Sequence, residues 1–253
     1  MISYTNIPVS LIEYCLVNRK INQLKLYIHL KLESDGYVLY SKSSFKDWSV
    51  SLGVSVKTIE SSLKWLTSQK WVTVNSRREA LHIISYSKLS LKLDLSFRTG
   101  VLFEPRTQKD YEYFKSFCCG VVISYYLGKK RYFDRQSVIK KGVAIKNCSR
   151  KNGYYPMANA YLGKCLGVSL STAFRIKQQA EKDGFIDVVS SFSYLEDISG
   201  NKIESIHYEA LRYVSYKEGQ PNRLRKTRQY LKVVESDLVS SHLRVKKKGY
   251  GKK

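Results

Sequence analysis

Long apolar runs are missing from this sequence. The longest apolar stretches, such as 118–123, are far shorter than the roughly 20 residues that a helix needs to cross a bilayer. The N-terminal residues 1–4 contain no basic region followed by an apolar one, so the sequence predicts no secretory signal. The chain has 253 residues, 43% of them hydrophobic, which is enough for two folded domains with cores of their own. We therefore expect a folded protein that does not enter a membrane.

Patterns for disulfide and metal binding are also missing. The chain has five cysteines, an odd number, with no Cys-x-x-Cys pair, and its four histidines are isolated from one another. This argues against a disulfide scaffold and a zinc site, and it fits a reducing cytosol. It also argues against the metal-dependent rolling-circle initiators, which use a pair of histidines flanking one residue. We expect no metal and a cytoplasmic location.

Groups suited to catalysis are scarce. No glycine-rich phosphate loop and no Gly-x-Ser-x-Gly motif occurs in the sequence. Acidic residues are few, and the adjacent pair Glu196-Asp197 would point to opposite faces of a strand. Most of the 20 tyrosines lie at helical or strand spacing, where packing is the simpler interpretation. We expect a non-enzymatic protein that uses no cofactor.

Negative charge is sparse relative to positive charge. Forty-four Lys and Arg residues face 21 Asp and Glu, which gives a formal net charge of +23. Such a surface favours a polyanionic partner. A membrane surface is the competing polyanion, but no basic helix with a continuous apolar face stands alone in the chain. Nucleic acid is therefore the expected partner.

One seven-residue phrase occurs twice, at 52–58 and 166–172. Five of its seven positions are identical, including Gly53 and Gly167, and each glycine is followed two positions later by a serine. Glycine readily takes the left-handed conformation that ends a helix. Serine accepts hydrogen bonds from the free N–H groups that begin the next helix. The phrase predicts a helix, a sharp turn and a second helix, in two copies.

The register around the phrase supports the repeat. With Ser55 and Ser169 as position zero, offset −7 is large and apolar and offset −6 is small in both copies. Offsets +4 and +11 fall on the inward side of a helix, and offsets +16 and +17 begin a β-rich run. These residues are Trp48, Ser49, Ile59, Leu66 and Trp71-Val72 in the first copy, and Leu162, Gly163, Ala173, Ala180 and Phe185-Ile186 in the second.

One offset breaks the match, since +8 is Leu63 in the first copy and Lys177 in the second. Either Lys177 lays its stem on the core and extends its ammonium to solvent, or the second helix is rotated.

Apolar spacing, glycines and prolines predict the order of elements. The first half is expected to contain helices at 21–32, 44–52 and 56–69, strands at 37–40, 71–75 and 81–86, an extended stretch at 89–95 and a connector holding Gly100 and Pro105. The second half is expected to contain helices at 110–127, 157–166 and 170–183, a basic loop at 129–153, and strands at 185–195 and 202–214. A further helix is expected near 223–236, and the last ten residues are expected to be disordered.

Both copies resemble winged helix-turn-helix domains, in which a β-hairpin wing follows the helix-turn-helix. The first hundred residues also resemble the N-terminal domains of replication initiators from plasmids, phages and mobile elements, in which a segment like Ile7-Pro8 precedes a helix like 22–27. The resemblance implies a mainly α fold with small β-wings (α+β). It implies one domain at 1–100, a second at 101–216, and a basic C-terminal extension at 217–253.

Helix-turn-helix proteins read DNA with the outward face of the second helix. Arginine can grip guanine with two hydrogen bonds and glutamine can do the same with adenine, so the second copy is the expected sequence reader. Arg77 and Arg78 at the first wing tip suit phosphates or a narrow minor groove, whereas Glu196-Asp197 would repel phosphate. An ordinary solvated helix face is the alternative for all of them. The candidate DNA-binding residues are Ser55, Lys57, Thr58, Ser61, Lys64, Arg77, Arg78, Ser169, Ser171, Thr172, Arg175, Gln178 and Gln179.

These features predict double-stranded DNA binding in replication initiation or transcriptional control on a phage, plasmid or mobile element. The first domain is expected either to read a neighbouring site or to mediate self-association. The alternative is a basic protein that coats or packages nucleic acid without sequence choice.

Overall fold

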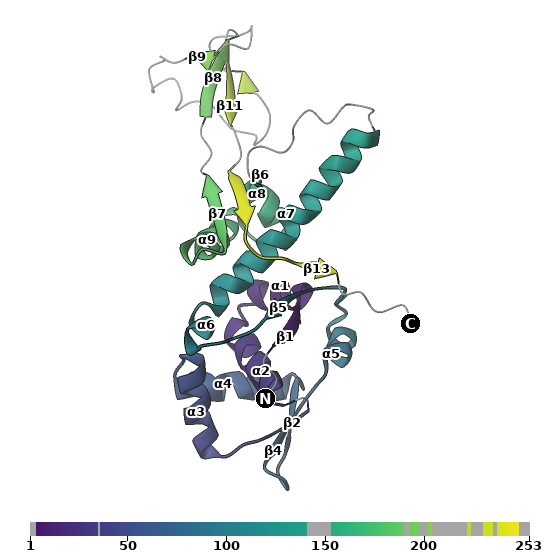
Figure 1. Cartoon of the computed structure of the whole chain (residues 1–253), viewed down its shortest axis with the longest axis vertical. Helices are drawn as coiled ribbons and strands as arrows, with labels where there is room; N and C mark the ends of the chain where they lie inside the picture. The colour runs from purple at the N-terminus through teal and green to yellow at the C-terminus, as the bar shows by residue number, and fades with distance from the viewer. Residues whose placement is uncertain are drawn as a thin grey trace. The chain divides into compact units, whose positions relative to one another are not determined.

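The computed structural model describes residues 4–34, 36–140, 153–189, 193–197, 202–203, 222–223, 230–234 and 237–247. This part of the chain is mixed α+β, with many helices and small antiparallel sheets (Figure 1), in agreement with the expected class. The elements of its first half are β1 (Thr5–Pro8), α1 (Val9–Val17), α2 (Ile21–Glu33), β2 (Tyr37–Leu39), α3 (Lys42–Leu52), α4 (Val56–Ser68), β3 (Val72–Asn75), β4 (Ala80–Ile83), α5 (Tyr86–Leu93), β5 (Thr99–Phe103) and α6 (Gln108–Glu112). The remaining elements are α7 (Phe114–Lys140), β6 (Tyr155–Pro156), α8 (Asn159–Leu166), α9 (Leu170–Lys182), β7 (Ile186–Val189), β8 (Ser193–Asp197), β9 (Lys202–Ile203), β10 (Asn222–Arg223), β11 (Tyr230–Val234), β12 (Leu238–Ser241) and β13 (Lys246–Lys247).

Two compact units are distinguished, and their bounds differ from the expected domains. The first comprises Met1–Tyr125, Arg175–Phe185 and His242–Lys253, and the second comprises Tyr126–Phe174 and Ile186–Ser241. The first unit extends past residue 100 because β5 pairs with β1, and α6 contacts α3. It also takes in the C-terminal strand β13, which pairs with β5 on its other edge.

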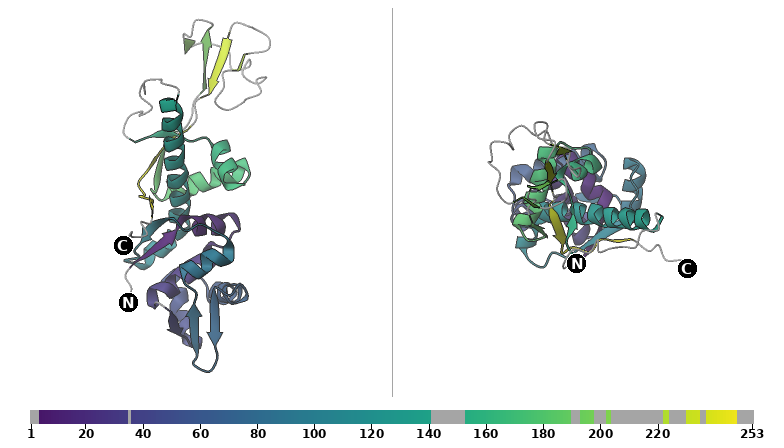
Figure 2. Two further views of the ribbon diagram at one scale, coloured as in Figure 1. Left: turned by 90° about the vertical axis from the view of Figure 1, so that its right-hand side faces the viewer. Right: turned by 90° about the horizontal axis from the view of Figure 1, so that it is seen from above.

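The elements around the first copy of the phrase form a small sheet with two helices. Strand β2 precedes α3 and α4, and the hairpin of β3 and β4 follows them (Figure 2). The sheet order is β2-β4-β3, all antiparallel, so β4 is central although it comes last in sequence.

The elements around the second copy repeat this topology. Strand β6 precedes α8 and α9, and β7 follows them. The central strand is β12, again the last in sequence, in the order β6-β12-β7. The chain between β7 and β12 carries a separate sheet of order β10-β11-β8-β9. The two copies therefore share one strand order and differ in what joins the last two strands.

The turns of the two copies share their glycine conformation and one backbone hydrogen bond. Gly53 and Gly167 have φ of 62° and 65°, in the left-handed region that ends a helix. Offset −1 donates to the carbonyl of offset −6 in both copies, over 3.1 Å in the first and 3.0 Å in the second. The expected hinges are confirmed.

The starts and ends of the second helices match as well. The hydroxyl oxygens of Ser55 and Ser169 accept hydrogen bonds from the backbone N–H groups three residues later, over 3.2 Å and 3.3 Å. At the other end, Trp71 and Phe185 donate their N–H to the carbonyl at offset +11 in both copies. Both helices thus have the same length, from the serine cap to the hydrogen bond donated at offset +16.

The same offsets are buried in both second helices. The core stripe consists of offsets +4, +7, +8 and +11 in each copy. Lys177 lies at +8 with only 2% of its surface exposed, and the neighbouring stripe positions are buried as in the first copy. The helix is therefore not rotated, and Lys177 takes the place of Leu63, with its side chain buried rather than extended to solvent. The stripe is Ile59, Ser62, Leu63 and Leu66 in α4, and Ala173, Ile176, Lys177 and Ala180 in α9.

Close helix crossing explains the small residue at offset −6. A Cβ atom on Gly163 would lie 3.0 Å from the carbonyl oxygen of Val168 and 3.7 Å from the Cβ of Ala173. A larger side chain would force α8 and α9 apart. In the first unit an aromatic cluster holds the helix pair, because Trp71 is 1% exposed and its ring lies 5.4 Å from Tyr27 and 5.2 Å from Trp65.

Several expected elements are wrong. Residues 86–93 form helix α5, although 89–95 was expected to be extended, because Ser85 caps the helix by accepting from the Lys88 N–H over 3.4 Å. The expected connector contains strand β5, and α7 continues to Lys140 through the first half of the expected basic loop. Residues 141–152 lie outside the described residues.

The C-terminal stretch also differs from the expectation. The described parts of 223–236 contain the strands β10 and β11 where a helix was expected. Strand β12 completes the second small sheet, and β13 lies within the last ten residues, which were expected to be disordered. Local composition did not indicate β12 and β13, because the strands that they pair with lie far away in the sequence. Residues 248–253 lie outside the described part of the chain.

Candidate nucleic-acid interface

The outward face of each second helix is formed by offsets +1, +2, +5, +6 and +9, which we call the reading face. These offsets lie opposite the core stripe, and every residue that occupies them in α4 and α9 is exposed. The reading face of α4 consists of Val56, Lys57, Glu60, Ser61 and Lys64. The reading face of α9 consists of Leu170, Ser171, Phe174, Arg175 and Gln178.

Hydroxyl groups at the start of each helix are already hydrogen bonded within the cap. The Thr58 hydroxyl lies 2.9 Å from the Ser55 hydroxyl, and the Thr172 hydroxyl lies 2.9 Å from that of Ser169. The Ser61 hydroxyl donates to the Thr58 carbonyl over 3.1 Å. These hydroxyls mainly hold the helix N-termini, and each keeps acceptor capacity for an outside donor.

Long polar side chains extend from both reading faces. Lys57 and Lys64 are exposed on α4, and Arg175 and Gln178 are exposed on α9. Each lysine supplies a flexible point charge, whereas the guanidinium of arginine is a planar fork suited to two parallel hydrogen bonds. Helix α9 therefore offers hydrogen bonds of more defined direction than α4 does.

Gln179 does not lie on the reading face, contrary to the expectation. Its side-chain amide donates to the Ser116 hydroxyl over 2.6 Å and approaches the Asp183 carboxylate at 3.5 Å. Ser116 is 1% exposed and donates in turn to Asp183. Offset +10 lies at the edge of the core stripe, and in the first copy it holds the half-buried Trp65. Gln179 therefore belongs to a polar contact with α7.

Two large apolar residues on the reading face of α9 were missed. Leu170 is 60% exposed and Phe174 is 46% exposed. The candidate residues predicted from the sequence are all polar or charged, although the offset from Ser169 alone places these two outward. Glu60 in α4 is likewise exposed on the reading face and absent from the predicted candidates, which are cationic or hydroxyl-bearing residues in that helix.

The tip of the β3–β4 hairpin carries Arg77 and Arg78, both exposed. The turn is held by Asn75, whose side-chain and backbone oxygens accept from the Arg78 N–H over 3.3 Å and 3.2 Å. Glu79 follows in a left-handed conformation, with φ of 46°. These contacts use the backbone of the turn, so they leave both guanidinium groups exposed at the tip of the hairpin.

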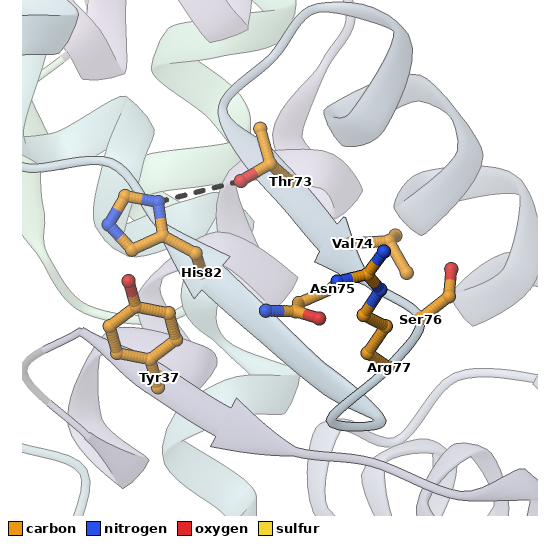
Figure 3. A pocket seen from close by; sticks show the side chains of 7 residues that line it. All are labelled: Tyr37, Thr73, Val74, Asn75, Ser76, Arg77 and His82. Atoms are coloured by element: carbon orange, nitrogen blue, oxygen red, sulfur yellow. Dashed lines mark hydrogen bonds between the residues drawn. The ribbon is translucent and has the colours of Figure 1, made fainter.

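A shallow hollow lies beside this tip (Figure 3). Strand register places Tyr37, His82 and Thr73 in one row across the sheet, and the rings of Tyr37 and His82 have centroids 4.8 Å apart. The Thr73 hydroxyl lies 3.5 Å from Nδ1 of His82. The lining residues are Tyr37, Thr73, Val74, Asn75, Ser76, Arg77 and His82. The hollow is open and lined mostly by polar side chains, and Arg77 gives it a positive charge.

Two cationic residues of α7, Lys130 and Arg131, lie over tyrosine rings. Lys130 Nζ lies 5.0 Å from the ring centroid of Tyr155 and 5.9 Å from that of Tyr161. Arg131 lies 5.4 Å from the Tyr155 ring and donates to the carbonyl of Gly153. These contacts stabilise the start of the second small sheet. They give these two cations a structural role alongside any contact with phosphate.

Buried thiols in the first unit are poor nucleophiles. Burial raises the pKa of Cys15 and Cys118 well above the ordinary range, and it raises the pKa of Cys119 to about 12. The thiolate is the reactive form, so these groups stay protonated at neutral pH. Within the described residues, no three His, Cys, Asp or Glu side chains gather as metal ligands would. No helix in the described part has the length and apolar character needed to cross a bilayer.

Comparison with known proteins finds no matching family model, no matching curated protein and no matching solved structure.

Proposed function

We propose that this protein binds double-stranded DNA through two winged helix-turn-helix domains and that it has no enzymatic activity. The observation that supports this most strongly is the recurrence of one arrangement. In each copy a left-handed glycine joins two helices, a serine caps the second, and the exposed face of that helix opposes a buried stripe. The net charge of +23 supplies the affinity for a polyanion.

The two reading faces would enter the major groove, each with its helix N-terminus toward the bases. Arg175 and Gln178 would make the base contacts in the second domain. Lys57 and Lys64 in the first domain would contact phosphates or guanine. Arg77 and Arg78 on the β3–β4 hairpin would contact the backbone or the adjacent minor groove.

The biological setting that we propose is the cytoplasm, with the DNA of a phage, plasmid or other mobile element as the target. Replication initiation and transcriptional control share the same DNA-binding geometry. Footprinting separates them, because protection of repeats beside an origin indicates initiation and protection across a promoter indicates regulation. The first domain would bind a neighbouring site or mediate self-association.

Sequence-independent coating of nucleic acid is the second candidate. It is favoured by the first reading face, where Lys57 and Lys64 are flexible charges and the nearby hydroxyls are hydrogen bonded to each other or to backbone. Such a face grips phosphate and distinguishes bases poorly. A coating protein would bind random duplex as tightly as any chosen one.

Selection of bound duplexes from a random pool tests the proposal. We expect one enriched motif that the full-length protein prefers over random duplex by at least about 1,000-fold in competition binding. Arg175→Ala should relax the base preference at one position and leave the affinity for random duplex nearly unchanged. Arg98→Ala, which removes an exposed arginine far along the chain from both reading faces, is the matched control. Absence of any enriched motif would exclude sequence-specific binding and favour coating.

A further inference from the structure

The reading face of α9 carries an apolar pair among its polar residues. Leu170 and Phe174 are four residues apart, so their side chains lie on one side of the first two turns of the helix. They are 60% and 46% exposed. The part of an apolar side chain that stays in water gains no hydrophobic stabilisation from folding.

Folding of the helix pair does not require these two residues. The core stripe of α9 is complete without them, since all four of its members are at most 8% exposed. The first copy shows the same fold with Val56 and Glu60 at the corresponding offsets +1 and +5. A charged residue is therefore compatible with offset +5, and the phenylalanine in the second copy calls for another explanation.

We propose that Leu170 and Phe174 recognise thymine, so that the DNA site of the second domain contains one or two thymines at fixed positions. This inference rests on the proposed function. The C5-methyl group of thymine is the apolar group that a base pair presents in the major groove, and apolar side chains such as phenylalanine contact it. Offset +5 lies next to Arg175 at +6, so the methyl contact would adjoin the contact of the guanidinium with a base or phosphate.

The polar residues beside this pair, Arg175 and Gln178, suit other bases than thymine. Arginine is matched to guanine and glutamine to adenine, and neither reads the thymine methyl. The apolar pair supplies the missing discrimination at the N-terminal end of the helix. The first domain lacks it, because Glu60 occupies offset +5 there. The two domains therefore read different sequences.

The decisive experiment removes only the methyl group from the DNA. In the duplex selected by the full-length wild-type protein, each thymine is replaced in turn by deoxyuridine, which keeps every hydrogen-bonding group of the base. We expect one or two positions at which the dissociation constant rises about 3- to 10-fold, a change typical of exposing a buried methyl group. Fluorescence anisotropy at fixed salt measures it. No variant protein is needed, so a folding defect cannot obscure the result.

A variant of Phe174 then tests whether this side chain causes the difference between thymine and deoxyuridine. Phe174→Ala should weaken binding to the thymine site by a similar factor and should abolish the difference between thymine and deoxyuridine. Leu91→Ala, which truncates an 84% exposed leucine on α5, is the matched control and should retain the full difference.

The possible outcomes separate the two proposals. If the wild-type protein prefers its selected duplex but tolerates deoxyuridine at every thymine, thymine recognition is wrong and the proposed function stands. If no duplex is preferred, both are wrong. If Phe174→Ala changes the oligomeric state in sedimentation while the thymine preference persists, the apolar pair is a self-association surface and thymine recognition through it is wrong.

Discussion

The ammonium group of Lys25 donates a 3.1 Å hydrogen bond to the carbonyl oxygen of Leu52. Leu52 is the last residue of α3, and its carbonyl lies immediately before the left-handed Gly53. Helix C-termini leave carbonyl groups without intrahelical partners, and a cation there is favourable. Lys25 on α2 thus fixes the point at which the first helix pair turns, although its side chain is only 7% exposed.

Burial of Lys25 gives stability a testable pH dependence. Burial lowers the pKa of this ammonium below its ordinary value of 10.5, while Cys118 and Glu112 act in the opposite direction. Between the lowered pKa and 10.5 the unfolded chain binds more protons than the folded one, so the Lys25 contribution to stability increases with pH. Below the lowered pKa both states are protonated, and the contribution is constant.

We therefore expect the free energy of unfolding of the wild type, minus that of Lys25→Met, to increase as the pH rises toward 10.5. Urea unfolding of both proteins over this pH range measures the difference. Lys64→Met removes an exposed lysine and controls for the loss of one charge. A difference that stays flat or declines with rising pH would contradict the assignment of the lowered pKa.

The left-handed hinge glycines predict a loss of stability when either one is changed to alanine. Gly53→Ala and Gly167→Ala should each destabilise the protein by about 1–2 kcal/mol, because an alanine pays a steric penalty in the left-handed conformation. Space is not the cause, since the nearest atom to an added Cβ lies 3.5 Å away at Gly53 and none lies within 4 Å at Gly167.

Gly128→Ala is the matched control for the hinges. Gly128 lies within α7 with nothing within 4 Å of an added Cβ, so alanine should stabilise the protein by about 0.5–1 kcal/mol. Calorimetric unfolding of the three variants measures both signs. Equal effects at all three glycines would show that the left-handed turns are not needed.

The contrast between correct and wrong expectations has a physical cause. The two helix pairs follow from local rules, because a serine cap, a left-handed glycine and a helical stripe all lie within about 20 residues of sequence. Strand β12 could not be found in this way. It pairs with β6 and β7, and strands β8, β9, β10 and β11, which lie between β7 and β12 in the sequence, form another sheet. Pairing over such a distance leaves no local pattern.

Other errors did have a local signal. Helix α5 is preceded by Ser85, whose hydroxyl accepts from the N–H three residues later, and it ends at the left-handed Asp94. Serine at position 85 is therefore a local signal for a helix at 86–93, a segment for which the sequence analysis predicts an extended stretch at 89–95. The candidate site also had a local signal, since the offsets of Leu170 and Phe174 from Ser169 place both on the outward face of the helix.

Arg77 and Arg78 at the tip of the β3–β4 hairpin predict a change in the salt dependence of DNA binding. If the proposed DNA complex neutralises six to ten phosphates, affinity should decrease about 10³- to 10⁵-fold between 50 and 200 mM salt. Changing both Arg77 and Arg78 to Gln should reduce the slope of log affinity against log salt by about 1.8, equally for selected and random duplex. Filter binding at several salt concentrations measures the slopes, with Arg98→Gln as the control. An unchanged slope would mean that Arg77 and Arg78 do not contact the phosphate backbone of the DNA.

The two adjacent glutamines of α9 are expected to have different roles, Gln179 in stability and Gln178 in base preference. Gln179 is hydrogen bonded to the buried Ser116 over 2.6 Å, so Gln179→Ala should reduce the free energy of unfolding by about 1 kcal/mol. Gln178 is exposed on the reading face, so Gln178→Ala should change stability by less than about 0.5 kcal/mol. Under the proposed function, Gln178→Ala should weaken the preference for one base pair, whereas Gln179→Ala should leave the base preference intact.

Thermal unfolding and binding to single-base variants of the selected duplex give both readouts on the same samples. The two substitutions are chemically identical and adjacent, so each is the control for the other. Reversed behaviour, with Gln179 setting base preference and Gln178 setting stability, would require α9 to be rotated about its axis. Such a rotation is incompatible with the buried positions of Ala173, Ile176 and Ala180 on the opposite side of the helix.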